Sequence, residues 1–296
     1  MLGAMFSAPP MPTFAPKQSV VTSSYLRYED VAQDGRMMPI AIPAAMAGLW
    51  RDVLVDHVGA KNALKTGVLP ILTRLTLATS GNAIRVDRPV ESHCGFELAH
   101  DRDGDAVSRL FMNVWANVSG TGGKLSRHTQ AGDLTLAGTL FGEHTYTRLL
   151  GPPDQRRVTR FEIEGLPEVP EARHHAQAPT TAGEAPTGAT WLDELAPDPT
   201  EYCFTLDHTD SNQHVNSLTY IRIFLDAVHR RFAATGKSGK LRTRAVDIAY
   251  RKPSFAGDRV RISLRLWQLG EDLGAAGVIS GDDGKPRSYV RVSVGP

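Results

Sequence analysis

Several features that define common protein classes are scarce in this sequence of 296 residues. Its 2 cysteines, Cys94 and Cys203, are too few for a disulfide framework and lack a Cys-x-x-Cys spacing, which favours a reducing cytosol. No apolar run approaches the ~18 residues of a membrane span. The 33 Lys and Arg residues balance 32 Asp and Glu residues, and no block of like charge indicates a nucleic-acid or membrane surface. We therefore predict a cytoplasmic protein that acts on neither nucleic acids nor membranes.

The short signatures of several enzyme classes are also missing. The sequence contains no Gly-x-Ser-x-Gly, no Gly-x-Gly-x-x-Gly and no His-Glu-x-x-His, and the Gly-rich residues 120–126 lack the first glycine of a phosphate-binding loop. His174 and His175 are adjacent but have no Cys or acidic neighbours at ligand spacing, so we expect a solvated pair. We predict no metal and no organic cofactor.

The composition and the proline distribution indicate two globular domains. The chain is 41% apolar and 22% charged, and its length suits about two domains of ~150 residues. Residues 1–19 hold four prolines without the basic and apolar segments of a signal peptide, so we expect a loose arm. Residues 166–200 are Pro-rich and are predicted to be a linker that forms neither helix nor sheet. This division leaves domains at 20–165 and 201–296.

The C-terminal domain has a simple periodicity. Residues 201–206 suit a short strand, and residues 216–234 place apolar side chains at steps of three or four, as in a helix. Asn216 or Ser217 suits the N-cap and Gly236 the C-terminal cap. Period-two patterns follow in residues 246–250, 259–266 and 289–294. The pattern predicts an α+β unit in which an antiparallel sheet packs on one helix.

The N-terminal domain repeats this order. A strand is expected at 24–31, a helix at 43–58 ended by Gly59, and strands at 71–77, 84–90, 94–100 and 106–116. The turn at Gly104 resembles the turn at Gly284, 180 residues later, which suggests two copies of one unit. Residues 133–164 are then expected to be strands without a counterpart in the second copy.

The polar loop before the second helix is the main candidate for chemistry. It runs from His208 to Asn216 and places Asp210, Asn212 and His214 within one short turn. Turn and capping roles explain Asp210 and Asn212, but His214 is a poor cap. It also lies where unpaired N–H groups and the positive end of the helix dipole gather. From the residues alone, capping and catalysis are equally good interpretations.

Residues 210–216, followed by Tyr220, resemble the Asp-x-Asn-x-His-Val-Asn-x-x-x-Tyr signature of hotdog-fold acyl-ACP and acyl-CoA thioesterases. Residues 247–253 and 257–260 resemble the following strand, turn and strand of the same unit. The two-unit layout is similar to the double hotdog of acyl-ACP thioesterases, with two antiparallel sheets each wrapped around a long helix. The resemblance implies thioester hydrolysis by Asp210, Asn212 and His214 in the C-terminal unit, with an acyl pocket in the N-terminal unit.

Further roles follow from this resemblance. Backbone N–H groups near Val215 and Asn216 are expected to stabilise the oxyanion, and the Tyr250 phenol to reach the thioester. The acyl pocket is expected to be lined by Met46, Leu49 and Trp50. Where the family often has Glu or Cys, this sequence has Pro253 and Ser254, so the resemblance supplies no acidic or thiol partner there, and Ser254 is taken as a substrate contact.

The departure at Pro253 and Ser254 keeps two alternatives open. One is a double-hotdog transferase, dehydratase or decarboxylase that acts on carrier-bound intermediates of a polyketide-type pathway. The other is a non-catalytic acyl-binding or carrier-docking module. The expected partners are acyl carrier protein or a coenzyme A thioester, and a homodimer is compatible with each interpretation.

Overall fold

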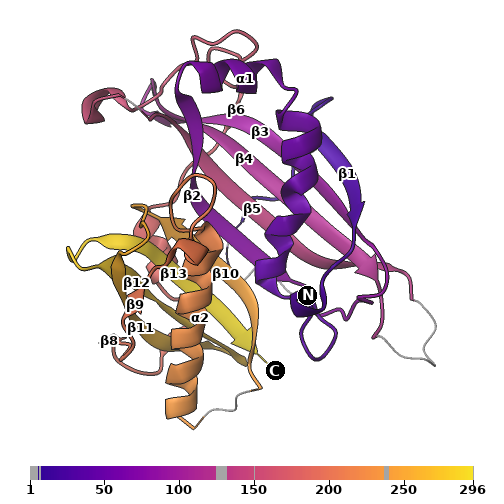
Figure 1. Ribbon diagram of the computed structural model, residues 1–296, viewed down its shortest axis with the longest axis vertical. Coiled ribbons are helices and arrows are strands. Elements are labelled where there is room, and N and C mark those ends of the chain that lie inside the picture. The colour runs from indigo at the N-terminus through magenta and orange to yellow at the C-terminus, as the bar shows by residue number, and fades with distance from the viewer. Residues whose placement is uncertain (1–5, 7, 125–131, 150, 237–239, 296) are drawn as a thin grey trace. The chain divides into compact units, whose positions relative to one another are not determined.

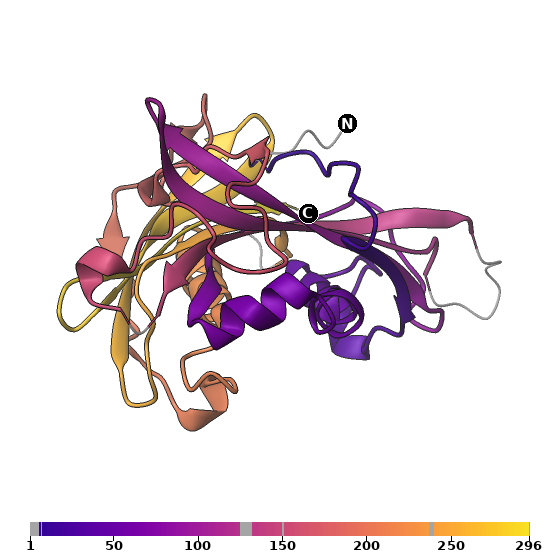
Figure 2. The same cartoon turned by 90° about the horizontal axis from the view of Figure 1, so that it is seen from above.

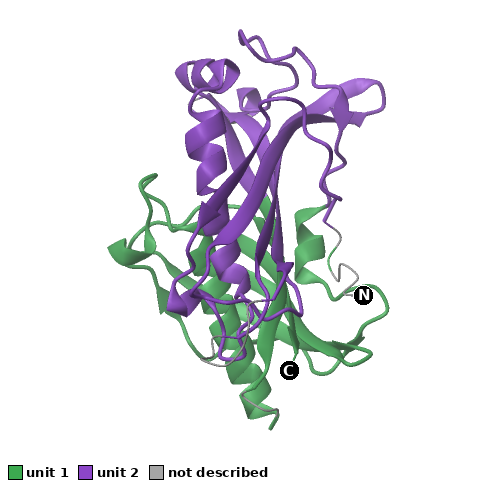
Figure 3. Ribbon diagram, turned by 90° about the vertical axis from the view of Figure 1, so that its right-hand side faces the viewer, with its two compact units in different colours: residues 1–7, 74–78, 178–296 green, residues 8–73, 79–177 purple. Residues whose placement is uncertain are grey.

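The computed structural model describes residues 6, 8–124, 132–149, 151–236 and 240–295 (Figure 1). Contacts divide the chain into an N-terminal unit, residues 8–73 and 79–177, and a C-terminal unit, residues 1–7, 74–78 and 178–296 (Figure 3). The division falls inside the stretch 166–200 that was expected as a linker. The C-terminal unit also takes residues 74–78, which the sequence assigned to the N-terminal domain 20–165.

The N-terminal unit is an antiparallel sheet with helical segments on one face (Figure 2). Its strands are β1 (Ser19–Ser24), β3 (Val90–Asp103), β4 (Ala106–Thr121) and β5 (Leu134–Arg148), in that spatial order, and the short β6 (Ala172–Arg173) runs parallel to β3. The 3-10 helices η1 (Tyr28–Asp30) and η4 (Pro153–Gln155) lie in the connections, and η2 (Pro39–Met46) packs on β3, β4 and β5.

The helix expected at 43–58 forms as three pieces of different geometry. The 3-10 helix η2 is followed by a π-helix, η3 (Leu49–Leu54), and an α-helix, α1 (Val58–Lys65). Pro39 and Pro43 lack the N–H that a regular α-helical hydrogen bond requires. Gly59 lies inside α1 and does not end a helix. Glycine is needed there for close packing, because a Cβ would collide with Leu166 and the Gly165 carbonyl. The expected boundaries were therefore wrong at both ends.

In the C-terminal unit one regular helix packs on antiparallel strands. The helix α2 (Ser217–Ala234) contacts strands β10 (Arg242–Tyr250), β11 (Arg259–Leu269), β12 (Asp272–Gly281) and β13 (Pro286–Gly295). The spatial order is β10-β13-β12-β11, and residues 74–78 of β2 (Val68–Thr79) pair with β10. The short β7 (Thr190–Trp191), β8 (Ala196–Pro197) and β9 (Tyr202–Cys203) pair with β11, while the 3-10 helices η5 (Pro179–Gly183) and η6 (Leu206–His208) lie in connections.

The structure confirms the helix-then-strands repeat but changes its alignment. In each half the second, third and fourth strands after the helical region are consecutive neighbours, β3-β4-β5 and β11-β12-β13. Gly104 joins the second strand to the third, whereas Gly284 joins the third to the fourth. The match between these turns was therefore wrong, and β5 does have a counterpart, β13. The strand expected at 24–31 is also wrong, since β1 ends at Ser24.

The segments expected to be loose make specific contacts. Phe6 is buried with Trp267 in the core of the C-terminal unit. The Pro9 carbonyl accepts a hydrogen bond from the Trp115 Nε1 at 3.0 Å, and the Phe14 ring packs against Gly95, where a Cβ would collide with it. The Pro-rich stretch 166–200 contributes β6, β7 and β8 to sheet edges, where short strands tolerate proline. Neither segment is a simple tether.

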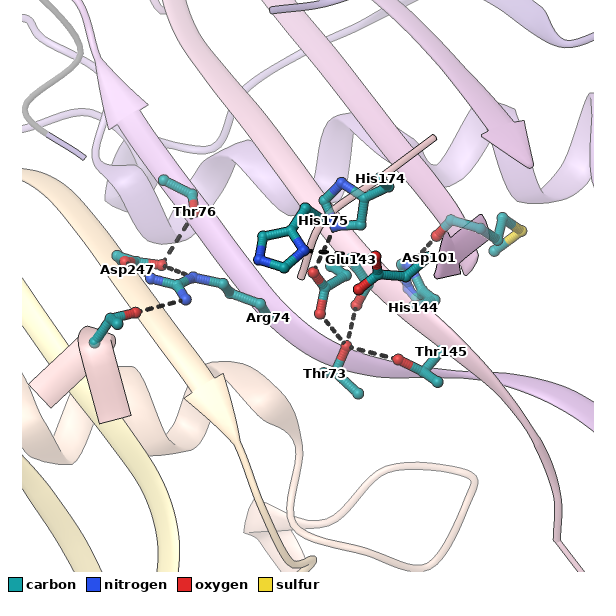
Figure 4. A network of polar contacts seen from close by, with 12 residues as sticks. Thr73, Arg74, Thr76, Asp101, Glu143, His144, Thr145, His174, His175 and Asp247 are labelled. Atoms are coloured by element: carbon teal, nitrogen blue, oxygen red, sulfur yellow. Dashed lines mark hydrogen bonds and ion pairs between the residues drawn. The ribbon is translucent and has the colours of Figure 1, made fainter. Parts of the chain in front are cut away.

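A buried ionic network fixes strand register in the C-terminal unit. The Asp247 carboxylate on β10 is 1% exposed and accepts a hydrogen bond from the Arg74 Nε at 2.8 Å (Figure 4). It also accepts one from the Arg291 Nε at 2.9 Å. The Thr76 hydroxyl donates to the same carboxylate at 3.1 Å. One buried anion therefore ties β2, β10 and β13 together, and removal of its charge would leave two buried guanidinium groups uncompensated.

None of the helices in the described ranges combines the length and the apolar character that a membrane span requires.

Candidate functional site

The polar loop before α2 is a closed turn built by its own backbone. The N–H of Asp210 donates to the His214 carbonyl at 3.0 Å, and the N–H of Gln213 donates to the Asp210 carbonyl at 2.9 Å. The Asp210 carboxylate accepts the N–H of Asn212 at 2.8 Å, which is an Asx turn. Gln213 takes a φ of 66°, a left-handed conformation at the tip of the turn. Asp210, Asn212 and His214 are thus brought together as the sequence predicts.

Two further hydrogen bonds hold the C-terminal side of this loop. The N–H of Asn216 donates to the His208 carbonyl at 2.8 Å, and the N–H of Val215 donates to the Ser254 carbonyl at 2.8 Å. The Ser254 N–H in turn donates to the Tyr220 hydroxyl on α2 at 2.8 Å. The residue after His214 is therefore fixed to the turn between β10 and β11 and, through it, to the helix.

The three polar side chains have different environments. His214 is half-buried, and its ring meets the ring of Phe255 edge-on, with centroids 5.9 Å apart. Asn212 is exposed, and the Asp210 carboxylate is engaged with the loop backbone. Among the described residues no hydrogen bond joins the side chains of Asp210 and His214. The imidazole is thus free to bind a water molecule or substrate, while Asp210 shapes the turn that presents it.

The start of α2 offers one backbone N–H group that is not used by the loop. The N–H groups of Val215 and Asn216 themselves have backbone acceptors, so a free N–H near these residues has to come from a neighbouring position. The Asn216 side chain caps the helix by accepting the N–H of Leu218 at 2.9 Å. Within the described part of the chain, the N–H of Ser217, the first helical residue, has no acceptor. It lies at the positive end of the helix dipole.

Tyr250 and Ser254 lie near the start of α2, and neither presents a hydroxyl group to solvent. The Tyr250 hydroxyl donates to the Ser217 carbonyl at 3.0 Å, and burial raises the pKa of this phenol. Ser254 is 0% exposed, and its hydroxyl has no hydrogen-bond partner among the described residues. Both residues therefore hold the loop and helix through the contacts seen here, and their roles as substrate contacts remain predictions.

The apolar residues predicted for the acyl pocket lie in the helical region of the N-terminal unit. Leu49 is 0% exposed, Met46 is half-buried, and Trp50 is 40% exposed with its ring 6.1 Å from that of His144. Burial lowers the pKa of His144 to about 4, so the imidazole is neutral at physiological pH. The region offers apolar surface at the expected residues, and its acyl-binding role remains a prediction.

The sequence did not predict a polar cluster around His174 in the N-terminal unit. The His174 Nε2 lies 2.7 Å from the Glu143 carboxylate, whose other oxygen accepts the Thr73 hydroxyl at 2.7 Å (Figure 4). His174 is therefore not part of a solvated pair, although His175 is exposed. The partners are too distant in sequence for local spacing to reveal them.

The cysteines and acidic residues form no second site. Cys94 is buried, and burial raises the pKa of its thiol to about 11, which disfavours the reactive thiolate. Cys203 is exposed. No group of three or more His, Cys, Asp or Glu side chains in the described ranges is arranged to bind a metal ion.

Comparisons with known proteins identify the fold. No protein-family model matches the sequence, and no curated protein matches it. An oleoyl thioesterase structure from Lactobacillus plantarum is similar, with a TM-score of 0.64, 14% identity, and coverage of 95% of this chain and 97% of that one.

Two further solved structures agree. A 12:0-ACP thioesterase from Umbellularia californica has a TM-score of 0.60 and 13% identity, with 94% of each chain covered. An acyl-ACP thioesterase from Bacteroides thetaiotaomicron has a TM-score of 0.59 and 13% identity, with 94% of this chain and 98% of that chain covered. The likeness extends over both halves of the chain, which therefore has the double-hotdog fold of acyl-ACP thioesterases.

Proposed function

We propose that the chain hydrolyses acyl thioesters carried by acyl carrier protein or coenzyme A, with His214 as the general base. The observation that carries this proposal is the half-buried imidazole, held by a rigid turn at the N-terminus of α2 and without an intraprotein hydrogen bond among the described residues. The likeness to acyl-ACP and oleoyl thioesterases supports the reaction class. A neutral imidazole is a suitable base near pH 7.

The proposed reaction needs few side chains. His214 accepts a proton from water while the water oxygen bonds to the thioester carbonyl carbon, and the developing oxyanion accepts the N–H of Ser217 at the positive end of α2. The C–S bond then breaks, and the protonated imidazole returns its proton to the leaving thiolate. Asn212, exposed at the turn, orients the water or the carbonyl, and Asp210 keeps the turn closed.

The direct test replaces the base. We expect His214→Ala to lower the rate of free-thiol release from acyl-ACP or acyl-CoA by a factor of about 10²–10⁴, with little change in the free energy of unfolding. The matched control is His175→Ala, which removes an exposed histidine in the other unit. A folded His214→Ala protein with wild-type turnover would contradict the mechanism.

The same assay compares the carriers and the acyl chains. Equal acyl groups on acyl carrier protein and on coenzyme A reveal which carrier is preferred. If Met46 lines the acyl pocket, Met46→Trp should reduce turnover of long chains more than that of short chains, because the larger side chain occupies the space of the distal methylenes. Unchanged chain-length preference would place the acyl pocket elsewhere.

A second candidate is acyl transfer or dehydration on carrier-bound intermediates. It is favoured by Pro253 and Ser254, which supply neither a carboxylate nor a thiol, and by the buried, unpartnered Ser254 hydroxyl. A change in acyl mass without thiol release would support this candidate over hydrolysis. Binding of the acyl chain without either change would support an acyl-binding module.

A further inference from the structure

The N-terminal unit contains a pocket of about 310 Å³ where β4, the end of β5 and residues 156–158 meet. Three arginines line it, together with two threonines of β5: Arg109, Arg156, Arg157, Thr145 and Thr147. Nothing in the proposed hydrolysis uses these residues. Three cationic side chains around one concave surface repel each other unless an anion lies between them.

Backbone carbonyls hold two of these guanidinium groups. The Arg156 Nε donates to the Gly151 carbonyl at 2.9 Å, and the Arg157 Nε donates to the Ser108 carbonyl at 2.6 Å. Each bond orients the planar group and leaves its two terminal nitrogens without a partner among the described residues. The Arg109 side chain makes no hydrogen bond within the same ranges. The pocket thus presents preoriented donors.

The positive charge of the pocket is not balanced by carboxylates. None of the three arginines forms an ion pair with a described residue, whereas Arg160, a few residues along the chain, contacts both Glu162 and Glu168. Acidic side chains on β3, β5 and η4 have other contacts or are exposed. Asp101, paired in register with Arg109, accepts the N–H of Arg102, Glu143 is bound to Thr73 and His174, and Asp154 of η4 is exposed.

We propose that this pocket binds a phosphate-bearing anion, either free inorganic pyrophosphate or the diphosphate of a nucleotide. Guanidinium forks match the oxygen spacing of phosphate and bind it with two parallel hydrogen bonds. Three cationic groups in one pocket repel each other, and a multivalent anion relieves that repulsion. Phosphate groups offer enough oxygens for all three arginines, whereas a single carboxylate does not.

Isothermal titration of the whole chain with pyrophosphate tests the proposal, and its result does not depend on thioester hydrolysis. We expect binding with a Kd of about 1 mM or lower that weakens as salt is added. Arg109→Ala removes a side chain with no internal hydrogen bond to lose, so the fold is retained, and it should weaken binding about tenfold or more. Arg157→Lys keeps the charge but loses the fork, and it should weaken binding less than Arg109→Ala.

A control variant tests whether binding is specific to the pocket, and a second ligand distinguishes a nucleotide from free pyrophosphate. Arg160→Ala removes a neighbouring guanidinium that is already paired, and it should leave the affinity unchanged. Tighter binding of ADP than of pyrophosphate would identify a nucleotide as the ligand, and equal binding would identify the free anion. The proposal is overturned if the wild-type chain does not bind either ligand, or if Arg109→Ala binds as well as Arg160→Ala.

Discussion

At the scale of single residues, Ser254 supports the loop through its main chain and not through its hydroxyl. Its carbonyl accepts the N–H of Val215, and its N–H donates to the Tyr220 hydroxyl, each at 2.8 Å. Residue 254 therefore connects the position next to His214 with the second turn of α2. These hydrogen bonds use the main chain of Ser254, so they do not require a Glu or Cys side chain at this position. The loop is therefore held in place although the sequence departs here from the thioesterase pattern.

The Tyr220 hydroxyl is the acceptor that this arrangement requires. Tyr220→Phe leaves the buried N–H of Ser254 without a partner, so we expect it to lower the free energy of unfolding by about 1–3 kcal/mol. Tyr250→Phe is the matched control, since it removes a hydroxyl that donates to a carbonyl inside α2. The Ser217 carbonyl keeps its helical hydrogen bond, so the control should cost less. Equal losses in urea unfolding would contradict this account.

The sequence predicted where the loop residues lie but not which of their backbone groups are already hydrogen-bonded. The spacing of Asp210, Asn212 and His214 was sufficient to place them in one turn before a helix, because the distances are set locally. It did not reveal that the N–H groups of Val215 and Asn216 are taken by acceptors at Ser254 and His208. Those acceptors come from other segments, and only the folded chain brings them to the loop.

At the scale of elements, α2 follows its local sequence closely. Its apolar spacing and its N-cap at Asn216 were predicted, and Gly236 follows the helix with the left-handed φ of 73° expected of a C-terminal cap residue. The helical region of the N-terminal unit was predicted poorly, because Pro39 and Pro43 impose 3-10 geometry and a π turn follows them. Apolar spacing at steps of three and four does not distinguish these geometries from a regular helix.

Asn216 allows capping and substrate binding to be separated. Because its side chain accepts the N–H of Leu218, Asn216→Ala should lower the free energy of unfolding by about 1 kcal/mol. Asn216→Asp keeps the acceptor and should restore stability. If the proposed oxyanion forms beside this residue, however, the added negative charge should lower kcat in the aspartate variant. An aspartate variant with both wild-type stability and wild-type kcat would restrict Asn216 to capping.

At the scale of the whole molecule, the buried polar contacts were beyond the reach of the sequence. Asp247 and Arg74 lie 173 positions apart and meet only because β10 pairs with β2. Glu143 on β5 and His174, which follows β6, are 31 positions apart and also come together only in the folded N-terminal unit. The alternation of apolar residues predicts that strands exist, but not which strands become neighbours, so charged residues within them are easily read as solvent-facing.

The neutral His144 should make the stability of the molecule depend on pH. Burial lowers its folded-state pKa to about 4 from the usual value of about 6.5. Between these values the unfolded chain binds a proton that the folded chain does not, so the free energy of unfolding should fall as the pH falls from about 6.5 to about 4. The full loss from this residue is about 3 kcal/mol, and it is absent above the unfolded-state pKa.

His144→Gln tests this dependence, because glutamine can still donate to the Met112 carbonyl that the His144 Nδ1 contacts at 3.2 Å, but does not titrate. Urea unfolding of both proteins at pH 7.5 and pH 5 gives the two differences needed. Burial also lowers the pKa of His57 and of His229, and these residues remain in both proteins, so their contributions cancel in the comparison. The variant should lose less stability than the wild type on acidification. Parallel pH profiles would mean that His144 is protonated equally in the folded and unfolded chains, and the neutral imidazole beside Trp50 would have to be abandoned.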